Sequence, residues 1–103
     1  MKTKIVEILK LKADAIAIGN QKQVSECDQK LRQLNLYQYN QGESVQTANE
    51  NLRCFKASFS DKQIQDALAV EVWATEFNCP DEFCIAVLVG KNGYIGHRII
   101  EGY

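Results

Sequence analysis

Cysteine carries the most reactive side chains of this 103-residue chain, at positions 27, 54, 79 and 84. That spacing fits neither a CxxC redox pair nor a zinc site built from two CxxC pairs. Cys27 is the candidate catalytic residue, because amide dipoles at the start of a helix can activate a thiol as a nucleophile. Cys27 also lies on the apolar stripe of the predicted helix, with Leu31 and Leu34, and this position favours a core residue.

A metal site could be imagined from Cys79, Cys84 and His97, the only histidine. A closed zinc site needs a fourth ligand, and none is evident, so we expect no metal and no cofactor. His97 lies between Ile95 and Ile99, a pattern that predicts a partly covered residue of an edge strand. A general base needs a partner within hydrogen-bond reach, and no sequence motif supplies one.

Charged residues indicate no other chemistry. Four acids recur every fifth residue on one predicted helix, which favours a solvated polar face: Asp61, Asp66, Glu71 and Glu76. Four lysines form a basic cluster near the N-terminus without interleaved aromatic residues, so we expect no nucleic-acid partner: Lys2, Lys4, Lys10 and Lys12.

Composition predicts one globular domain over residues 1–103. Hydrophobic residues make up 46% of the chain, and the net charge is −1, which gives no drive toward nucleic acid or an anionic membrane. No apolar run approaches the ~20 residues that span a bilayer. Charged residues interrupt the first 20 positions, so we expect no export signal, a cytoplasmic location and reduced thiols.

The N-terminal third favours helices. Residues 3–18 suit a helix throughout, or a short first element followed by a strand at about 13–18 that ends at Gly19. Residues 22–38 show a helical apolar stripe, and Ser25 with Asp28 resembles a capping box.

Residues 38–51 contain few apolar groups and predict a long loop, a kind of segment that is often functional. Tyr37 and Tyr39 at its entry are candidate aromatic anchors for a protein partner.

The next segment has two interpretations. Residues 52–59 alternate and predict a strand, and Ser60 with Gln63 forms a capping box that opens a helix. Residues 61–77 favour a helix, because of that cap and their alanine content. Their alternative is a strand over 67–77, because the apolar residues there also alternate.

Residues 83–100 predict a β-hairpin. The apolar run 83–89 is typical of a strand buried on both faces, and Asn92-Gly93 suits a type I′ turn. With that turn, Leu88 pairs with His97 and Val87 with Arg98. One face would then hold Phe83, Ile85, Val87, Val89, Arg98 and Ile100, and the other Cys84, Ala86, Leu88, Ile95, His97 and Ile99. The second strand is more polar, so we place it nearer the sheet edge.

The closing stretch FNCPDEFCIAVLVGKNGYIGHRI resembles a small uncharacterised thioredoxin-like family. Members of that family end with a proline, a buried strand, a Gly-Lys-Asp-Gly turn and a final strand, and the resemblance covers about a quarter of this chain. With a strand at 13–18 and a helix at 22–38, the order of elements becomes βαβαββ, which resembles the core of the thioredoxin fold. The expected fold is therefore α/β, thioredoxin-like, with a C-terminal β-hairpin. If 67–77 is a strand, the expected fold is instead α+β, with N-terminal helices followed by a four-stranded antiparallel sheet, cystatin-like or related.

These observations favour a small non-enzymatic protein that binds another protein or regulates it. The residues expected at the contact are Tyr37, Tyr39, His97 and Arg98. The alternative is a thiol-dependent redox protein that uses Cys27. The partner and the oligomeric state do not follow from the sequence.

Overall fold

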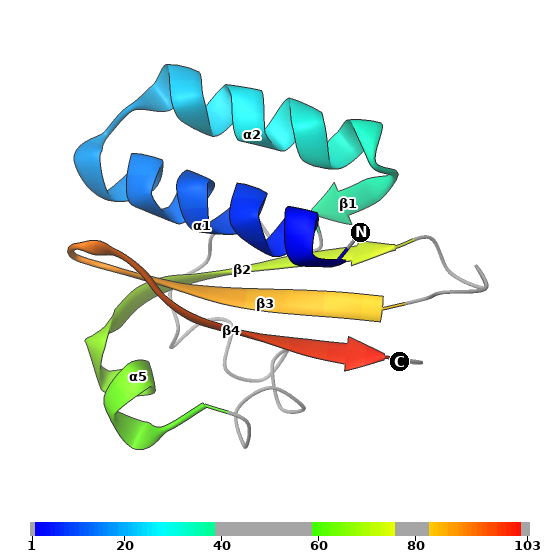
Figure 1. The fold of residues 1–103 in the computed structure, drawn as a ribbon. Coiled ribbons are helices and arrows are strands. Elements are labelled where there is room, and N and C mark those ends of the chain that lie inside the picture. The colour runs from blue at the N-terminus through cyan, green and yellow to red at the C-terminus, as the bar shows by residue number, and fades with distance from the viewer. Residues whose placement is uncertain (1, 39–58, 76–82, 102–103) are drawn as a thin grey trace.

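The computed structural model describes residues 2–38, 59–75 and 83–101. Two helices come first and pack along one another, as Figure 1 shows: α1 (Lys2–Ile18) and α2 (Gln21–Gln33). The remaining elements are β1 (Leu36–Gln38), α5 (Asp61–Asp66), β2 (Ala67–Thr75), β3 (Phe83–Gly90) and β4 (Gly93–Glu101).

Helix α1 covers the whole of residues 3–18, the first segment with two interpretations. Ile5, Ile8, Leu9 and Ala13 recur at helical spacing, and all four are buried. The helix ends at Gly19, which has φ 72°, a left-handed conformation that glycine adopts without a steric penalty. The helical interpretation of 3–18 is therefore confirmed, and the strand at 13–18 is wrong.

Helix α2 begins earlier and ends earlier than predicted. Asn20 is its N-cap, and the Asn20 side chain accepts a hydrogen bond from the Gln23 amide at 3.2 Å. The expected cap at Ser25 is wrong, since Ser25 lies inside the helix. Asn35 has φ 63° and ends the helical run, so the last predicted helical residues form β1 instead.

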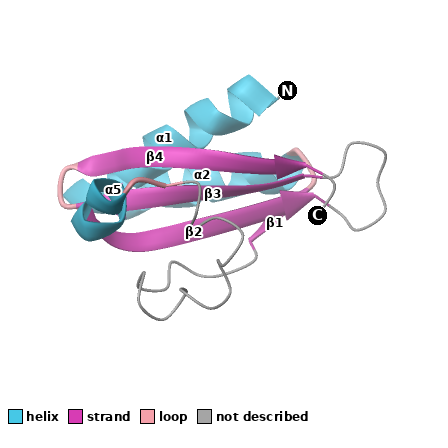
Figure 2. Cartoon of the chain, turned by 90° about the horizontal axis from the view of Figure 1, so that it is seen from below, coloured by secondary structure: helices cyan, strands magenta, loops and turns pink. Residues whose placement is uncertain are grey.

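The four strands form one antiparallel sheet in the order β1-β2-β3-β4. Helices α1 and α2 cover one face (Figure 1), and α5 lies on the other face near the β3–β4 turn, as Figure 2 shows. Trp73, Ile85 and Val87 pack under the two long helices, whereas Val70, Ala86 and Leu88 pack on the α5 side. Burial of β3 on both faces is confirmed, and β4 is an outer strand of the sheet that the described residues form.

Helix α5 and strand β2 divide the segment that was predicted as one helix. The capping box is confirmed, because the Ser60 hydroxyl accepts from the Gln63 amide and the Gln63 side chain accepts from the Ser60 amide. A helix over 61–77 is wrong beyond Asp66. From Ala67 onward the chain pairs with β3, and both faces of the strand are buried from Val70 to Ala74, which outweighs helical propensity.

The β3–β4 hairpin is confirmed, but its turn and register differ from the prediction. Gly90 pairs with Gly93, so Lys91 and Asn92 are the turn residues. Gly93 has φ 110°, whereas neither turn residue has positive φ, so the turn is not type I′.

A bulge then shifts the register of β4 by one residue. Val89 pairs with Tyr94 and Leu88 with Gly96, which leaves Ile95 as the extra residue. A shift of one residue moves side chains to the opposite face. The predicted faces are right for β3 and wrong for the part of β4 beyond the bulge, where Ile99 packs under the helices.

The order of elements is α+β, with two N-terminal helices ahead of an antiparallel sheet. The thioredoxin-like order βαβαββ is wrong for the part of the chain that the structure describes, because no strand there precedes α2 and every strand pair is antiparallel. A βαβ unit requires parallel strands joined by a crossover. The predicted strand at 52–59, except Phe59, and the predicted loop beyond Gln38 lie outside the described residues.

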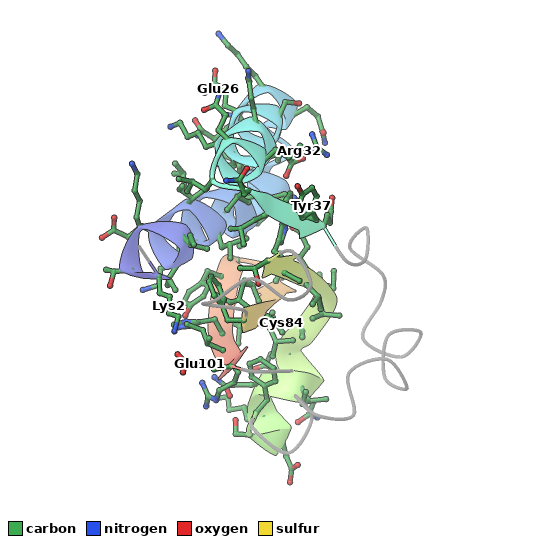
Figure 3. All side chains as sticks on the ribbon, turned by 90° about the vertical axis from the view of Figure 1, so that its right-hand side faces the viewer. Lys2, Glu26, Arg32, Tyr37, Cys84 and Glu101 are labelled. Carbon is green, nitrogen blue, oxygen red and sulfur yellow. The ribbon has the colours of Figure 1, made fainter. Side chains whose placement is uncertain are left out.

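The two ends of the described chain lie close together. Lys2 on α1 forms an exposed ion pair with Glu101 on β4, and Figure 3 shows the two side chains next to one another. Among the helices that the structure describes, none is long and apolar enough to cross a membrane.

Candidate functional site

Strand β4 is the longest sheet edge that the structure describes. It contributes nine residues and pairs with β3 on one side. None of the described strands pairs with its other side. An outer strand of this kind exposes amide and carbonyl groups that can pair with another chain.

Tyr94 and His97 form a hydrogen-bonded pair on β4. The Tyr94 hydroxyl lies 2.6 Å from His97 Nδ1. Residues three apart on a regular strand point to opposite faces, so the bulge at Ile95 is what places both rings on the helix side. The sequence analysis missed this partner of His97 because it assumed a regular strand.

Cations of two elements surround this pair. Lys10 Nζ of α1 lies 5.1 Å from the centre of the Tyr94 ring. Burial, together with the positive charges of Lys10 and Arg98, lowers the pKa of His97 below its usual 6.5. Burial also raises the pKa of Tyr94. The pair is therefore held as a neutral imidazole and a neutral phenol near pH 7.

Asp14 of α1 fixes the start of the strand, because its Oδ1 accepts a hydrogen bond from the Tyr94 amide at 3.0 Å. Helix α1 therefore contributes both a cation and an anion to this region of β4.

Arg98 lies on the opposite face of β4 from His97. Its guanidinium carbon is 5.3 Å from the centre of the Phe59 ring, and Nη1 donates to the His97 carbonyl at 2.7 Å. The two predicted contact residues on this strand therefore share an edge but present different faces.

Tyr37 lies at the other side of the molecule. It belongs to β1, the opposite edge of the sheet from β4, and is 51% exposed. Figure 3 shows its ring at the outer side of that strand. Tyr39 lies outside the described residues. The three predicted contact residues that the structure describes therefore do not form one surface.

Cys27 is placed in the core. It lies in the second turn of α2 with none of its surface exposed, and Gln23 Nε2 is 3.7 Å from its sulfur. The expectation that Cys27 lies at the start of a helix is wrong, because α2 begins at Gln21. The core interpretation of Cys27 is confirmed.

The imagined Cys-Cys-His metal site does not form from its described members. Cys84 packs on the α5 side of the sheet, whereas His97 lies on the helix side with Tyr94. Within residues 2–38, 59–75 and 83–101, no group of three potential ligands lies close enough to hold a metal ion. Cys54 and Cys79 fall outside those ranges.

A buried ionic cluster lies under the two long helices, and the sequence analysis missed it. Lys12 of α1 and Glu71 of β2 form an ion pair, and their residues are only 3% and 4% exposed. Lys12 Nζ also lies 2.5 Å from Asp28 Oδ1 of α2. The expectation that Glu71 belongs to a solvated polar face is wrong, because Glu71 lies on a strand rather than on a helix. Glu76 lies outside the described residues.

Three donors converge on a single oxygen of Glu71. Besides Lys12, Gln38 Nε2 donates to Oε1 at 3.0 Å and Trp73 Nε1 donates at 3.4 Å. Lys12 Nζ also lies 5.0 Å from the centre of the Trp73 ring. Asp28 Oδ1 is buried, and its partner among the described residues is the Lys12 ammonium group.

A sequence signal for this cluster exists. Lys12 falls on the apolar stripe of α1, three residues beyond Leu9, and Glu71 is flanked by Val70 and Val72. A lysine on one apolar face and a carboxylate inside an apolar strand are the two halves of a buried pair, because such charges are rarely buried alone.

The chain was compared with family models, with curated proteins and with solved structures, and no match was found.

Proposed function

We propose that this chain is a cytoplasmic, non-enzymatic protein-binding module that receives an extended segment of its partner along β4. The observation that carries the proposal is the nine-residue outer strand, whose far side pairs with no described strand. A segment that adds to a sheet edge gains affinity from backbone hydrogen bonds and specificity from side-chain contacts. The free thiol of Cys27 fits a reducing compartment.

Side chains on both faces of β4 supply the specificity in this proposal. Tyr94 and His97 give a half-buried aromatic pair on one face, and Arg98 gives a guanidinium on the other. Lys2 is paired with Glu101, whereas Lys10 contacts the Tyr94 ring and no carboxylate of the described residues. The positive charge of Lys10 beside β4 favours a partner segment that carries an acidic side chain.

A peptide selection tests the proposal. Extended peptides that bind the chain are selected from a random display library, and the amide NMR signals of the chain are followed as a selected peptide is added. We expect the largest shifts along β4 and selected sequences enriched in Asp or Glu. Shifts confined to the α1–α2 surface would contradict the proposal.

Matched variants locate the contact. Arg98→Ala should lower the affinity for the selected peptide at least tenfold. Lys62→Ala, which removes an exposed cation from α5, should leave that affinity unchanged. Equal effects of the two changes would indicate nonspecific attraction rather than recognition at β4.

A second surface is proposed from the exposure of Tyr37 on β1. Together with Tyr39 and the polar residues that follow, Tyr37 can give aromatic contact area at a modest entropic cost. Tyr37→Ala and replacement of residues 40–50 by a Gly/Ser linker test this surface. If these changes abolish peptide binding and Arg98→Ala does not, the contact lies at β1 and not at β4.

The redox alternative, a thiol-dependent protein that uses Cys27, is less well supported. A nucleophilic thiol must reach its substrate, and Cys27 is enclosed in the core.

A further inference from the structure

A cavity of about 250 Å³ lies against the buried ionic cluster. Lys12, Gln38 and Glu71 form its polar side, and its apolar side consists of Ile16, Val24, Ala69 and Val89. Ile16 is exposed, so the cavity lies near the surface of the described chain. This volume is far above the ~10–15 Å³ that one ordered water needs, so the cavity can hold a small molecule.

The charges around the cavity leave an excess of negative charge. One cation, Lys12, is matched against two carboxylates, Glu71 and Asp28. No other charged side chain of the described residues lines the space. An anionic ligand would have to compete with both carboxylates for Lys12, so electrostatics favour a cation.

Acceptor atoms are also left over at this position. The three hydrogen bonds donated to Glu71 all go to Oε1, and none of the described residues donates to Oε2. Gln38 uses its amide nitrogen as the donor, so its carbonyl oxygen remains an acceptor. A buried carboxylate that retains acceptor capacity at a cavity wall is suited to a ligand that donates several hydrogen bonds.

We propose that this cavity binds a small molecule that carries a primary ammonium group and a short apolar tail. The ammonium group donates to Glu71 Oε2 and to the Gln38 carbonyl, and it offsets the excess charge of the cluster. The tail packs against Ile16, Val24 and Val89. A neutral alcohol of the same shape lacks the charge, and a carboxylate has the wrong sign.

Trp73 makes binding measurable, because it is the only tryptophan and its indole donates to Glu71 Oε1. Tryptophan emission is followed while n-butylammonium chloride, n-butanol or sodium butyrate is added at constant ionic strength. We expect a saturable change with n-butylammonium, and affinities at least tenfold weaker for the other two. The absence of a saturable response to n-butylammonium, or an equal response to n-butanol, would overturn the proposal.

Two variants assign the site. Ala69→Leu fills the cavity without changing its charge, and Glu71→Gln removes the excess charge while Asp28 still neutralises Lys12. Each variant should lower the affinity for n-butylammonium at least tenfold. Leu68→Ala, at the exposed neighbouring position, should leave that affinity unchanged. Parent-like affinity in the Ala69→Leu protein, with its fold verified by circular dichroism, would show that the ammonium group binds elsewhere.

Discussion

The thiol of Cys27 is enclosed by the core that α1 and α2 form over the sheet. We therefore expect Cys27 to react slowly with iodoacetamide in the folded chain and quickly in urea, with peptide mass spectrometry resolving each site. Cys84 is half-buried and serves as the reference within the same molecule. Labelling of Cys27 near neutral pH as fast as in the unfolded chain would revive the redox alternative.

His97 should make the stability of the fold depend on pH. The pKa of His97 is lowered by burial and by the positive charges of Lys10 and Arg98. Between this lowered pKa and pH 6.5, the unfolded chain therefore binds a proton at His97 that the folded chain does not bind. Stability from this group should therefore rise with pH through that range and level off above it.

Urea unfolding at intervals from about pH 5 to pH 8 measures the effect in the parent chain and in His97→Gln, which keeps an acceptor for Tyr94. The parent should gain more stability with rising pH than the variant, because His97 is the only histidine. Identical slopes would show that His97 titrates alike in both states.

Sequence patterns predicted the Cys27 environment but not that of Glu71. Cys27 follows from a helical stripe of one element, where spacing alone identifies the buried face. The environment of Glu71 depends on Lys12 and Asp28, which lie far away in the sequence and meet only when the helices lie on the sheet. A pattern within one element carries no information on such a partner.

Asn20 should determine where α2 begins. Its side chain satisfies the Gln23 amide, so Asn20→Ala is expected to cost about 1 kcal/mol in the free energy of unfolding. Ser25→Ala is the matched control, because Ser25 is an exposed residue inside the helix and should change stability little. A larger loss for Ser25 than for Asn20 in urea unfolding would return the cap to its predicted position.

Gly93 holds the β3–β4 turn against α1. It has φ 110°, and a Cβ added there would lie within van der Waals overlap of Asp14 Oδ1. Gly93→Val should therefore cost about 3 kcal/mol or more, because steric conflict adds to the ~1–3 kcal/mol of backbone strain.

Gly19→Val is the control for this change. Gly19 also has positive φ, but nothing lies within 4 Å of its added Cβ, so strain acts there alone. In thermal unfolding, the melting temperature of the Gly93→Val chain should be clearly below that of the Gly19→Val chain. Equal melting temperatures would mean that the contact with Asp14 adds nothing to the loss of stability.

Elements were predicted well where the apolar period was unambiguous. Helix α1, the capping box at Ser60 and the buried strand β3 all follow from local patterns. The strand at residues 67–75 does not follow from local patterns, because the apolar residues there fit both the helical period and the strand period. Pairing with β3 decides between the two. The bulge at Ile95 was also unpredictable, since one inserted residue leaves no signal in the hydrophobic pattern.

The ion cluster connects both layers of the molecule, with Lys12 from α1, Asp28 from α2 and Glu71 from β2. Lys12→Met would leave the buried Glu71 carboxylate and the partly buried Asp28 carboxylate without a counter-charge, so we expect a loss of about 3–5 kcal/mol. Adding Glu71→Gln should recover part of that loss, because it removes one of the uncompensated charges.

Lys2→Met is the matched control, since it breaks the exposed pair with Glu101 and should cost less than about 1 kcal/mol. Urea unfolding of the three variants and the parent gives these differences. A Lys12→Met chain as stable as the Lys2→Met chain would mean that the cluster contributes no more than a surface pair.

The packing of α1 against β3 and β4 also determines when its apolar stripe can be buried during translation. The ribosome makes α1 before β3 and β4, so the apolar stripe from Ile5 to Ala13 stays uncovered until some 70 further residues have been added. Until then the α1–α2 hairpin exposes Ile5, Leu9 and Leu31, which are attractive to chaperones and to other nascent chains. Contacts of such long sequence separation also slow folding, because loop-closure entropy is lost before they form.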